Sequence, residues 1–127
     1  MEFINIMENT RFKKELPSYL RFIQLVESIG LMKLSPELDD LEAHLLDRIA
    51  INALSGTHVQ IGEMLALSQL GSQATIHNRI KRLTANGYLS VRIDQADARR
   101  KYLIPTSLAK KRFDVLSKAL NKAVLGA

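Results

Sequence analysis

The stretch that decides the fold is SQATIHNRIKRLTANGYLSVRIDQADARRKYLIPT, residues 72–106. Apolar residues recur in its first part at helical spacing, at Ile76, Ile80 and Leu83. Gly87 then suits the left-handed conformation in which helices often end. Beyond this glycine the pattern changes to two short segments, rich in β-branched and aromatic residues, that flank a charged turn. The stretch therefore predicts a helix over 72–86, capped by Ser72, followed directly by a hairpin over 88–105.

The segment 10–30 is expected to form a long helix with a wide apolar face. One apolar row contains Phe12, Leu16, Tyr19, Ile23 and Val26, and the row beside it contains Phe22, Leu25 and Ile29. A face of this width exceeds what a small core needs, so we expect part of it to pack against another protein.

Three more helices complete the expected order. Ser35 and Pro36 suit the cap and the first position of the second helix, and a third, shorter helix covers about 59–67. Thr106 or Ser107 is expected to cap the last helix. Its apolar face is formed by Ala109, Phe113, Leu116, Leu120 and Ala123. The predicted fold class is mainly α with a small β-hairpin and helices at both ends.

The composition is that of a soluble globular protein of one domain over 1–127. The apolar content is 46%, and the absence of cysteine excludes disulfides and thiolate metal sites. The first ten residues carry two acidic side chains and no long apolar run, unlike a secretory signal. No stretch approaches the roughly 18 apolar residues of a membrane span. We therefore expect a cytoplasmic protein.

Motifs of known catalytic sites are absent from the sequence. It contains no Walker loop, no HExxH and no GxSxG, and its histidines, His44, His58 and His77, are too scattered to indicate a zinc site. The sequence therefore predicts no enzymatic activity, no cofactor and no metal.

Charge is distributed unevenly along the chain, whose net charge is +5. Between Pro36 and Leu70 six acidic residues stand against one basic residue. Between Ile76 and Arg112 ten basic residues stand against two acidic residues. An acidic half followed by a basic half indicates a surface suited to a polyanion.

Two helices joined by a short glycine-containing turn and followed by a hairpin indicate a winged helix-turn-helix. From about Leu45 to Leu116 the sequence resembles the MarR family of winged helix-turn-helix transcription regulators. The resemblance rests on SQATI, residues 72–76, in the recognition helix and on DARRKYLIPT, residues 97–106, in the wing. It implies a DNA-binding regulator with recognition helix 72–86 in the major groove and wing 93–104 in the minor groove.

The chain departs from the family pattern at a few positions. Pro105 replaces the usual Leu of the wing, Ala109 stands where a Gly often follows the Thr, and Asn78 takes the place of a frequent Arg. Leu70-Gly71 inverts the order common in the turn.

The candidate DNA contacts lie on the outward face of the recognition helix and on the wing. They are Ser72, Gln73, Thr75, His77, Asn78, Lys81, Arg82, Arg99, Arg100 and Lys101. Asn can pair bidentately with adenine, and Lys and Arg can reach guanine or phosphate. Asp97 cannot attract DNA, so we expect it to hold a wing arginine by a charge-assisted hydrogen bond.

The leading interpretation is a homodimeric repressor that binds double-stranded DNA. Helices 10–30 and 107–125 would form the dimer interface, and 35–106 would form the DNA-binding core. One alternative is a winged-helix protein-interaction module without specific DNA binding. Another is a DNA-binding protein of plasmid or phage replication. The sequence leaves open whether a small-molecule effector exists.

Overall fold

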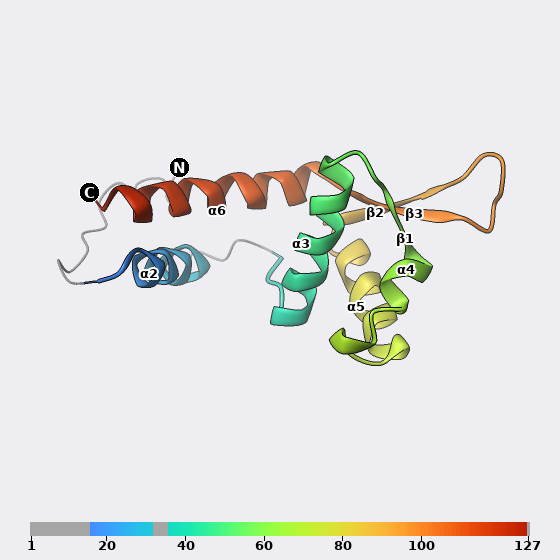
Figure 1. The fold of residues 1–127 in the computed structure, drawn as a ribbon, viewed down its shortest axis with the longest axis horizontal. Helices are drawn as coiled ribbons and strands as arrows, with labels where there is room; N and C mark the ends of the chain where they lie inside the picture. Colours follow the sequence, from blue (N-terminus) through green and yellow to red (C-terminus); the bar gives the residue numbers. More distant parts are fainter. Residues whose placement is uncertain (1–15, 32–35, 127) are drawn as a thin grey trace. The chain divides into compact units, whose positions relative to one another are not determined.

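The computed structural model describes residues 16–31 and 36–126. The chain divides into two compact units, a core unit of Leu38–Lys110 and a terminal unit of Met1–Glu37 with Lys111–Ala127. The elements, labelled in Figure 1, are α2 (Ser18–Leu31), α3 (Asp40–Leu54), β1 (Val59–Gln60), α4 (Ile61–Leu65), η1 (Ser68–Leu70), α5 (Gln73–Ala85), β2 (Leu89–Ile93), β3 (Lys101–Pro105) and α6 (Ser107–Leu125). The expected class, mainly α with a wing after a helix-turn-helix, is confirmed.

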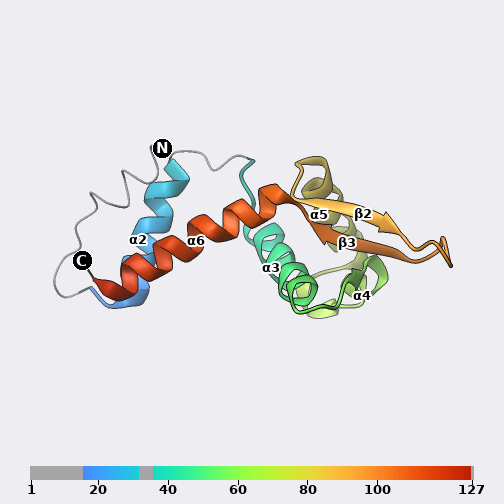
Figure 2. The ribbon, with the colours of Figure 1, turned by 90° about the horizontal axis from the view of Figure 1, so that it is seen from above.

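The core unit packs α3, α4 and α5 against one antiparallel sheet of order β1-β3-β2. Its buried apolar residues are Leu45, Leu46, Ile49, Ala50, Val59, Met64, Ile76, Ile80, Leu83, Tyr88, Leu89, Leu103 and Ala109. Figure 2 shows β2 and β3 side by side, extending as a hairpin away from the helices of this unit. The helix stripe at Ile76, Ile80 and Leu83 is thus buried as predicted, and the opposite face of α5 is left outward.

The segment expected as a third helix over 59–67 begins instead as a strand. Val59 and Gln60 form β1, and Val59 pairs with Leu103 of β3. Pairing buries the β-branched Val59 in the sheet, and the helix is confined to Ile61–Leu65. The wing therefore belongs to a three-stranded sheet, where the sequence predicted only a hairpin.

The second helix starts later than expected. Its cap is Asp39, whose Oδ1 accepts a hydrogen bond from the Glu42 backbone N–H at 2.7 Å, and Glu42 Oε1 accepts one from the Asp39 N–H at 3.0 Å. This reciprocal capping box satisfies two backbone donors, an advantage that the predicted start at Pro36 lacks. Pro36 precedes the helix, and Ser35, the expected cap, lies outside the described residues.

The terminal unit is built on α2 and the part of α6 beyond Lys110. Its buried cluster consists of Leu25, Ile29, Val115, Ala119 and Ala123, with Phe22 packed against it. Of the two apolar rows predicted for 10–30, the second is therefore the one buried within the chain. Helix α2 begins at Ser18, and residues 10–15 of the predicted helix lie outside the described residues.

The buried face of α6 agrees with the predicted one only in part, because Ala109 and Ala123 are buried as predicted but other buried positions differ. Val115 and Ala119 are buried, whereas Leu120 is exposed and Leu116 is half-buried. Small side chains at Ala119 and Ala123 let α2 pack closely, and this decides the face more strongly than hydrophobicity does. The large apolar residues Leu120 and Val124 consequently remain at the surface.

Candidate nucleic-acid interface

The start of α5 is held by a glycine turn and a serine cap. Gly71 has a φ of 140°, a conformation that strains any residue with a Cβ. Ser72 Oγ accepts a hydrogen bond from the Thr75 backbone N–H at 3.1 Å and donates one to Thr75 Oγ1 at 2.9 Å. Ser72 is therefore the cap expected from the sequence, and the half-buried Thr75 keeps its own hydroxyl hydrogen for another acceptor.

The outward face of α5 is polar and basic along its length. Gln73, His77, Asn78 and Lys81 are exposed, as expected for a helix that packs its apolar stripe inward. These side chains offer the donors and acceptors that could match base edges in a major groove. The first backbone N–H groups of the helix lie beside Ser72, where an anion such as phosphate is favoured.

Arg82 occupies a different position from the other candidate contacts on α5. Its Nε lies 3.5 Å from Glu42 Oε2, and its Nη1 lies 3.8 Å from Asp39 Oδ2. Arg79, one turn earlier on the same flank, places its Nε 2.8 Å from Asp39 Oδ2. Arg82 thus faces the start of α3, where its guanidinium lies beside the carboxylates of Asp39 and Glu42.

This acid–arginine cluster of Asp39, Glu42, Arg79 and Arg82 was not predicted from the sequence. One signal could have found it: both the acids and the arginines are three residues apart, so each pair lies on one helix face. The pKa of Asp39 is held below its ordinary value, chiefly because its carboxylate accepts the Glu42 backbone N–H and also because Arg79 lies beside it. Asp39 therefore stays ionised in weakly acidic solution.

The wing places Asp97 against two arginines. Asp97 Oδ1 accepts hydrogen bonds from Arg99 Nε at 3.1 Å and from the Arg99 backbone N–H at 3.0 Å, and Oδ2 accepts one from Arg99 Nη2 at 3.3 Å. Arg100 Nε lies 3.8 Å from Oδ2. These contacts, led by the Arg99 side-chain hydrogen bond, lower the pKa of Asp97. Asp97 thus has the arginine partner that the sequence predicts. The effect of this contact on DNA binding stays a prediction.

The wing arginines remain available to a ligand despite this pairing. The side chain of Arg99 is 91% exposed and that of Arg100 is 58% exposed. Lys101 is also exposed, at the start of β3, where it pairs with Ile93 of β2. Asp97 therefore restrains the arginines without covering them.

A second acidic residue of the wing, Asp94, organises the loop. Its Oδ1 accepts the backbone N–H groups of Ala96 at 2.8 Å and Asp97 at 3.3 Å, and Tyr102 donates its hydroxyl to Oδ2 at 3.2 Å. The Ala96 hydrogen bond is the largest cause of a lowered pKa at Asp94. Both acids within the basic wing thus hold the loop that carries its cations, and sequence reasoning missed the role of Asp94.

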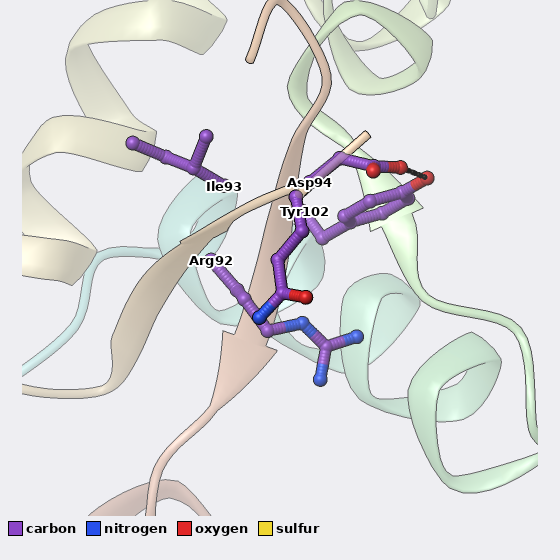
Figure 3. A pocket seen from close by; sticks show the side chains of 5 residues that line it. Arg92, Ile93, Asp94 and Tyr102 are labelled. Carbon is purple, nitrogen blue, oxygen red and sulfur yellow. Dashed lines mark hydrogen bonds between the residues drawn. The ribbon is translucent and has the colours of Figure 1, made fainter. Parts of the chain in front are cut away.

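A pocket open to solvent lies on the wing beside this hydrogen bond (Figure 3). Its lining residues are Arg92, Ile93, Asp94, Gln95 and Tyr102. Arg92 and Tyr102 pair directly across the two strands, and the Arg92 guanidinium lies 5.9 Å from the Tyr102 ring centroid. The sequence did not single out Arg92, which adds an exposed cation to this part of the wing.

Residues 16–31 and 36–126 form neither a metal-binding cluster nor a membrane-spanning helix. Within these ranges no three His, Cys, Asp or Glu side chains gather in a way that could hold a metal ion. No helix within the same ranges has the length and apolar character needed to cross a membrane.

Several solved structures share this fold. A transcriptional regulator from Thermotoga maritima superposes with a TM-score of 0.62 at 19% identity, over 84% of this chain and 67% of that chain. A MarR protein from Peptoclostridium difficile gives 0.54 at 20% identity, over 91% and 76%. A mutant of MepR from S. aureus, bound to an oligodeoxyribonucleotide, gives 0.58 at 15% identity, over 85% and 79%. No protein-family model and no curated protein matches the sequence.

Proposed function

We propose that this chain, which has the winged helix-turn-helix fold of MarR-type transcription regulators, is a sequence-specific regulator that binds double-stranded DNA. The observation that carries the proposal is the outward polar and basic face of α5, on the same compact unit as a wing whose exposed Arg99 is held by Asp97. The likeness to a MepR structure that contains an oligodeoxyribonucleotide supports it. The protein would act as a regulator and not as an enzyme.

In this proposal α5 enters the major groove. Asn78 and Gln73 have the amide pair that matches adenine N6 and N7, and Lys81 can reach guanine or a phosphate. Ser72, Thr75 and His77 would contact the backbone or base edges near the start of the helix. The half-exposed Arg82 keeps guanidinium nitrogens for a phosphate at the flank of the groove.

The wing would lie along the adjacent minor groove. Arg99 would enter the groove, where a narrow A·T-rich segment enhances the negative potential, while Arg100 and Lys101 would contact the flanking phosphates. The hydrogen bonds that Arg99 donates to Asp97 already restrict the arginine side chain, so less conformational freedom is lost when DNA binds.

The proposal includes a homodimer that acts as a cytoplasmic repressor. Five large apolar side chains of the terminal unit are exposed: Tyr19, Leu20, Leu120, Val124 and Leu125. A symmetric interface would cover them and would place two copies of α5 on two half-sites of DNA. A dimer bound over a promoter would block transcription by occupying it.

Selection of duplexes from a random pool, followed by titration at two salt concentrations, tests DNA recognition. We expect a pseudo-palindromic sequence to be enriched and to bind at least a thousandfold more tightly than a scrambled duplex. Equal and strongly salt-dependent binding to both duplexes would overturn the proposal in favour of a protein-interaction module.

Sedimentation tests the dimer separately. Leu120→Lys with Val124→Lys should give a folded monomer, because both side chains are exposed in the protomer. Leu25→Lys is the contrasting variant, since Leu25 is fully buried in the protomer and its replacement should unfold the terminal unit. An unmodified protein that sediments as a monomer at micromolar concentration would contradict the dimer and the palindromic site.

A further inference from the structure

The acid–arginine cluster contains a carboxylate that is closed off from water. Glu42 has no exposed surface, and its Oε1 is used by the Asp39 backbone N–H. Its Oε2 is buried without a hydrogen-bond donor and faces Arg82 Nε at 3.5 Å. A buried carboxylate is stabilised by a nearby cation, so electrostatic attraction holds Arg82 at this position.

Both oxygens of the second carboxylate of the cluster have partners. Asp39 uses Oδ1 to cap α3 through the Glu42 backbone N–H, which leaves Oδ2 to face Arg79 at 2.8 Å and Arg82 at 3.8 Å. The first turn of α3 is anchored in turn by Leu45 and Leu46, which are fully buried. The acids therefore form a fixed point against which α5 is held.

The two arginines sit next to the residues proposed to read DNA. Arg79 directly follows Asn78, and Arg82 directly follows Lys81. Successive helical residues point about 100° apart, so holding an arginine on the flank of α5 also sets the direction of the residue before it. A base contact requires its side chain to be placed within about 0.5 Å.

We propose that Asp39 and Glu42 are positioning residues for base recognition: through Arg79 and Arg82 they fix the rotation of α5 before DNA arrives. This inference rests on the proposed function and deepens it. The acids touch no DNA, and their negative charge opposes general attraction to a duplex. Their contribution lies in the difference between a preferred and a scrambled sequence.

The test compares Asp39→Asn with Asp40→Asn. Asparagine caps a helix as well as aspartate does, so Asp39→Asn keeps the cap and removes the charge that faces the arginines. Asp40 is exposed in the same helical turn, and its replacement changes the net charge by the same amount. The measurement is the discrimination ratio, the dissociation constant for the scrambled duplex divided by that for the selected duplex, at two salt concentrations.

We expect Asp39→Asn to reduce this ratio roughly tenfold, the scale of one well-formed base contact, although the protein becomes more positive. Asp40→Asn should leave the ratio unchanged. Arg79→Gln should lower the ratio as Asp39→Asn does, and the double variant should lose no more discrimination than either single variant. Arg79→Lys, which restores the positive charge, should have a higher ratio than Arg79→Gln. Tighter binding of Asp39→Asn to both duplexes with an unchanged ratio would overturn the inference.

Hydrogen exchange of the DNA-free protein separates this inference from the proposed function. Asp39→Asn should accelerate exchange in α5 relative to β2 and β3, and Asp40→Asn should not. A parent protein that binds all duplexes equally would overturn the proposed function, and the exchange comparison then decides whether the acids anchor α5. Identical exchange in both variants would overturn the anchoring.

Discussion

Two regions of the core unit use the same chemistry in different surroundings. In the wing, Asp97 holds Arg99 two residues away, and the arginine side chain lies almost wholly at the surface while the aspartate is half-buried. In the acid–arginine cluster, the acids of α3 meet arginines of α5, and Glu42 is fully buried. Water screens the pairing in the wing and weakens its effect on folding. In the cluster, burying the Glu42 carboxylate costs free energy of desolvation, which the attraction to Arg82 must offset. We therefore expect the cluster to govern stability together with base discrimination, and the wing to govern general affinity for DNA.

The largest effect should come from removing the partner of the buried carboxylate. Arg82→Ala should lower the free energy of unfolding by about 2 kcal/mol, less than for a fully buried pair because water reaches the half-exposed arginine. Denaturant unfolding followed by circular dichroism measures it. The matched control is Lys81→Ala, an adjacent exposed cation whose loss should change stability by less than about 0.5 kcal/mol. Equal stability of the two variants would remove the distinction between the regions.

The next effect should appear in DNA binding without a matching loss of stability. Asp97→Ala should weaken binding to all duplexes a few-fold, because the wing arginine loses the contact that orients it. This direction is informative, since the variant is more positive and general attraction alone predicts tighter binding. Asp114→Ala, an exposed acid on α6, makes the same change in charge and serves as the control. Tighter binding by Asp97→Ala would show that the wing is only a solvated loop.

A smaller effect is expected in the salt dependence. Arg99→Ala should reduce the slope of log affinity against log salt by about one unit, the contribution of one phosphate-type contact. Asn78→Ala should leave that slope unchanged and relax the preference at one base position. Fluorescence anisotropy titrations over a salt series measure both variants. An unchanged slope in Arg99→Ala would exclude that arginine from the interface.

The smallest effect should be the pH dependence of stability. The pKa of Asp39 is lower in the folded protein than its ordinary value of 3.8. Its contribution to the free energy of unfolding is therefore complete above pH 3.8 and is lost as the pH falls through the lower pKa of the folded state. Acid titration of unfolding should therefore be less steep below about pH 4 in Asp39→Asn than in the parent. Asp40→Asn is the control. Superimposable acid profiles of Asp39→Asn and the parent would contradict the lowered pKa of Asp39 in the folded protein.

The local parts of this protein follow from its sequence alone. Helix α5, its cap at Ser72 and its end at Gly87 follow from neighbouring residues, and so does the contact between Asp97 and Arg99. Each depends on groups within a few positions of one another, for which spacing and residue type are sufficient information. The winged helix-turn-helix could be recognised because these local signals stand in one order.

Which distant segments meet depends on the tertiary fold. Val59 becomes a strand because Leu103 lies beside it, and the capping acids of α3 become anchors because Arg79 lies across from them. The small residue Ala119, and not the larger Leu120, faces α2 for the same kind of reason. Propensity and periodicity describe one segment at a time, whereas strand pairing, close packing and buried charge depend on a partner that the local sequence does not contain.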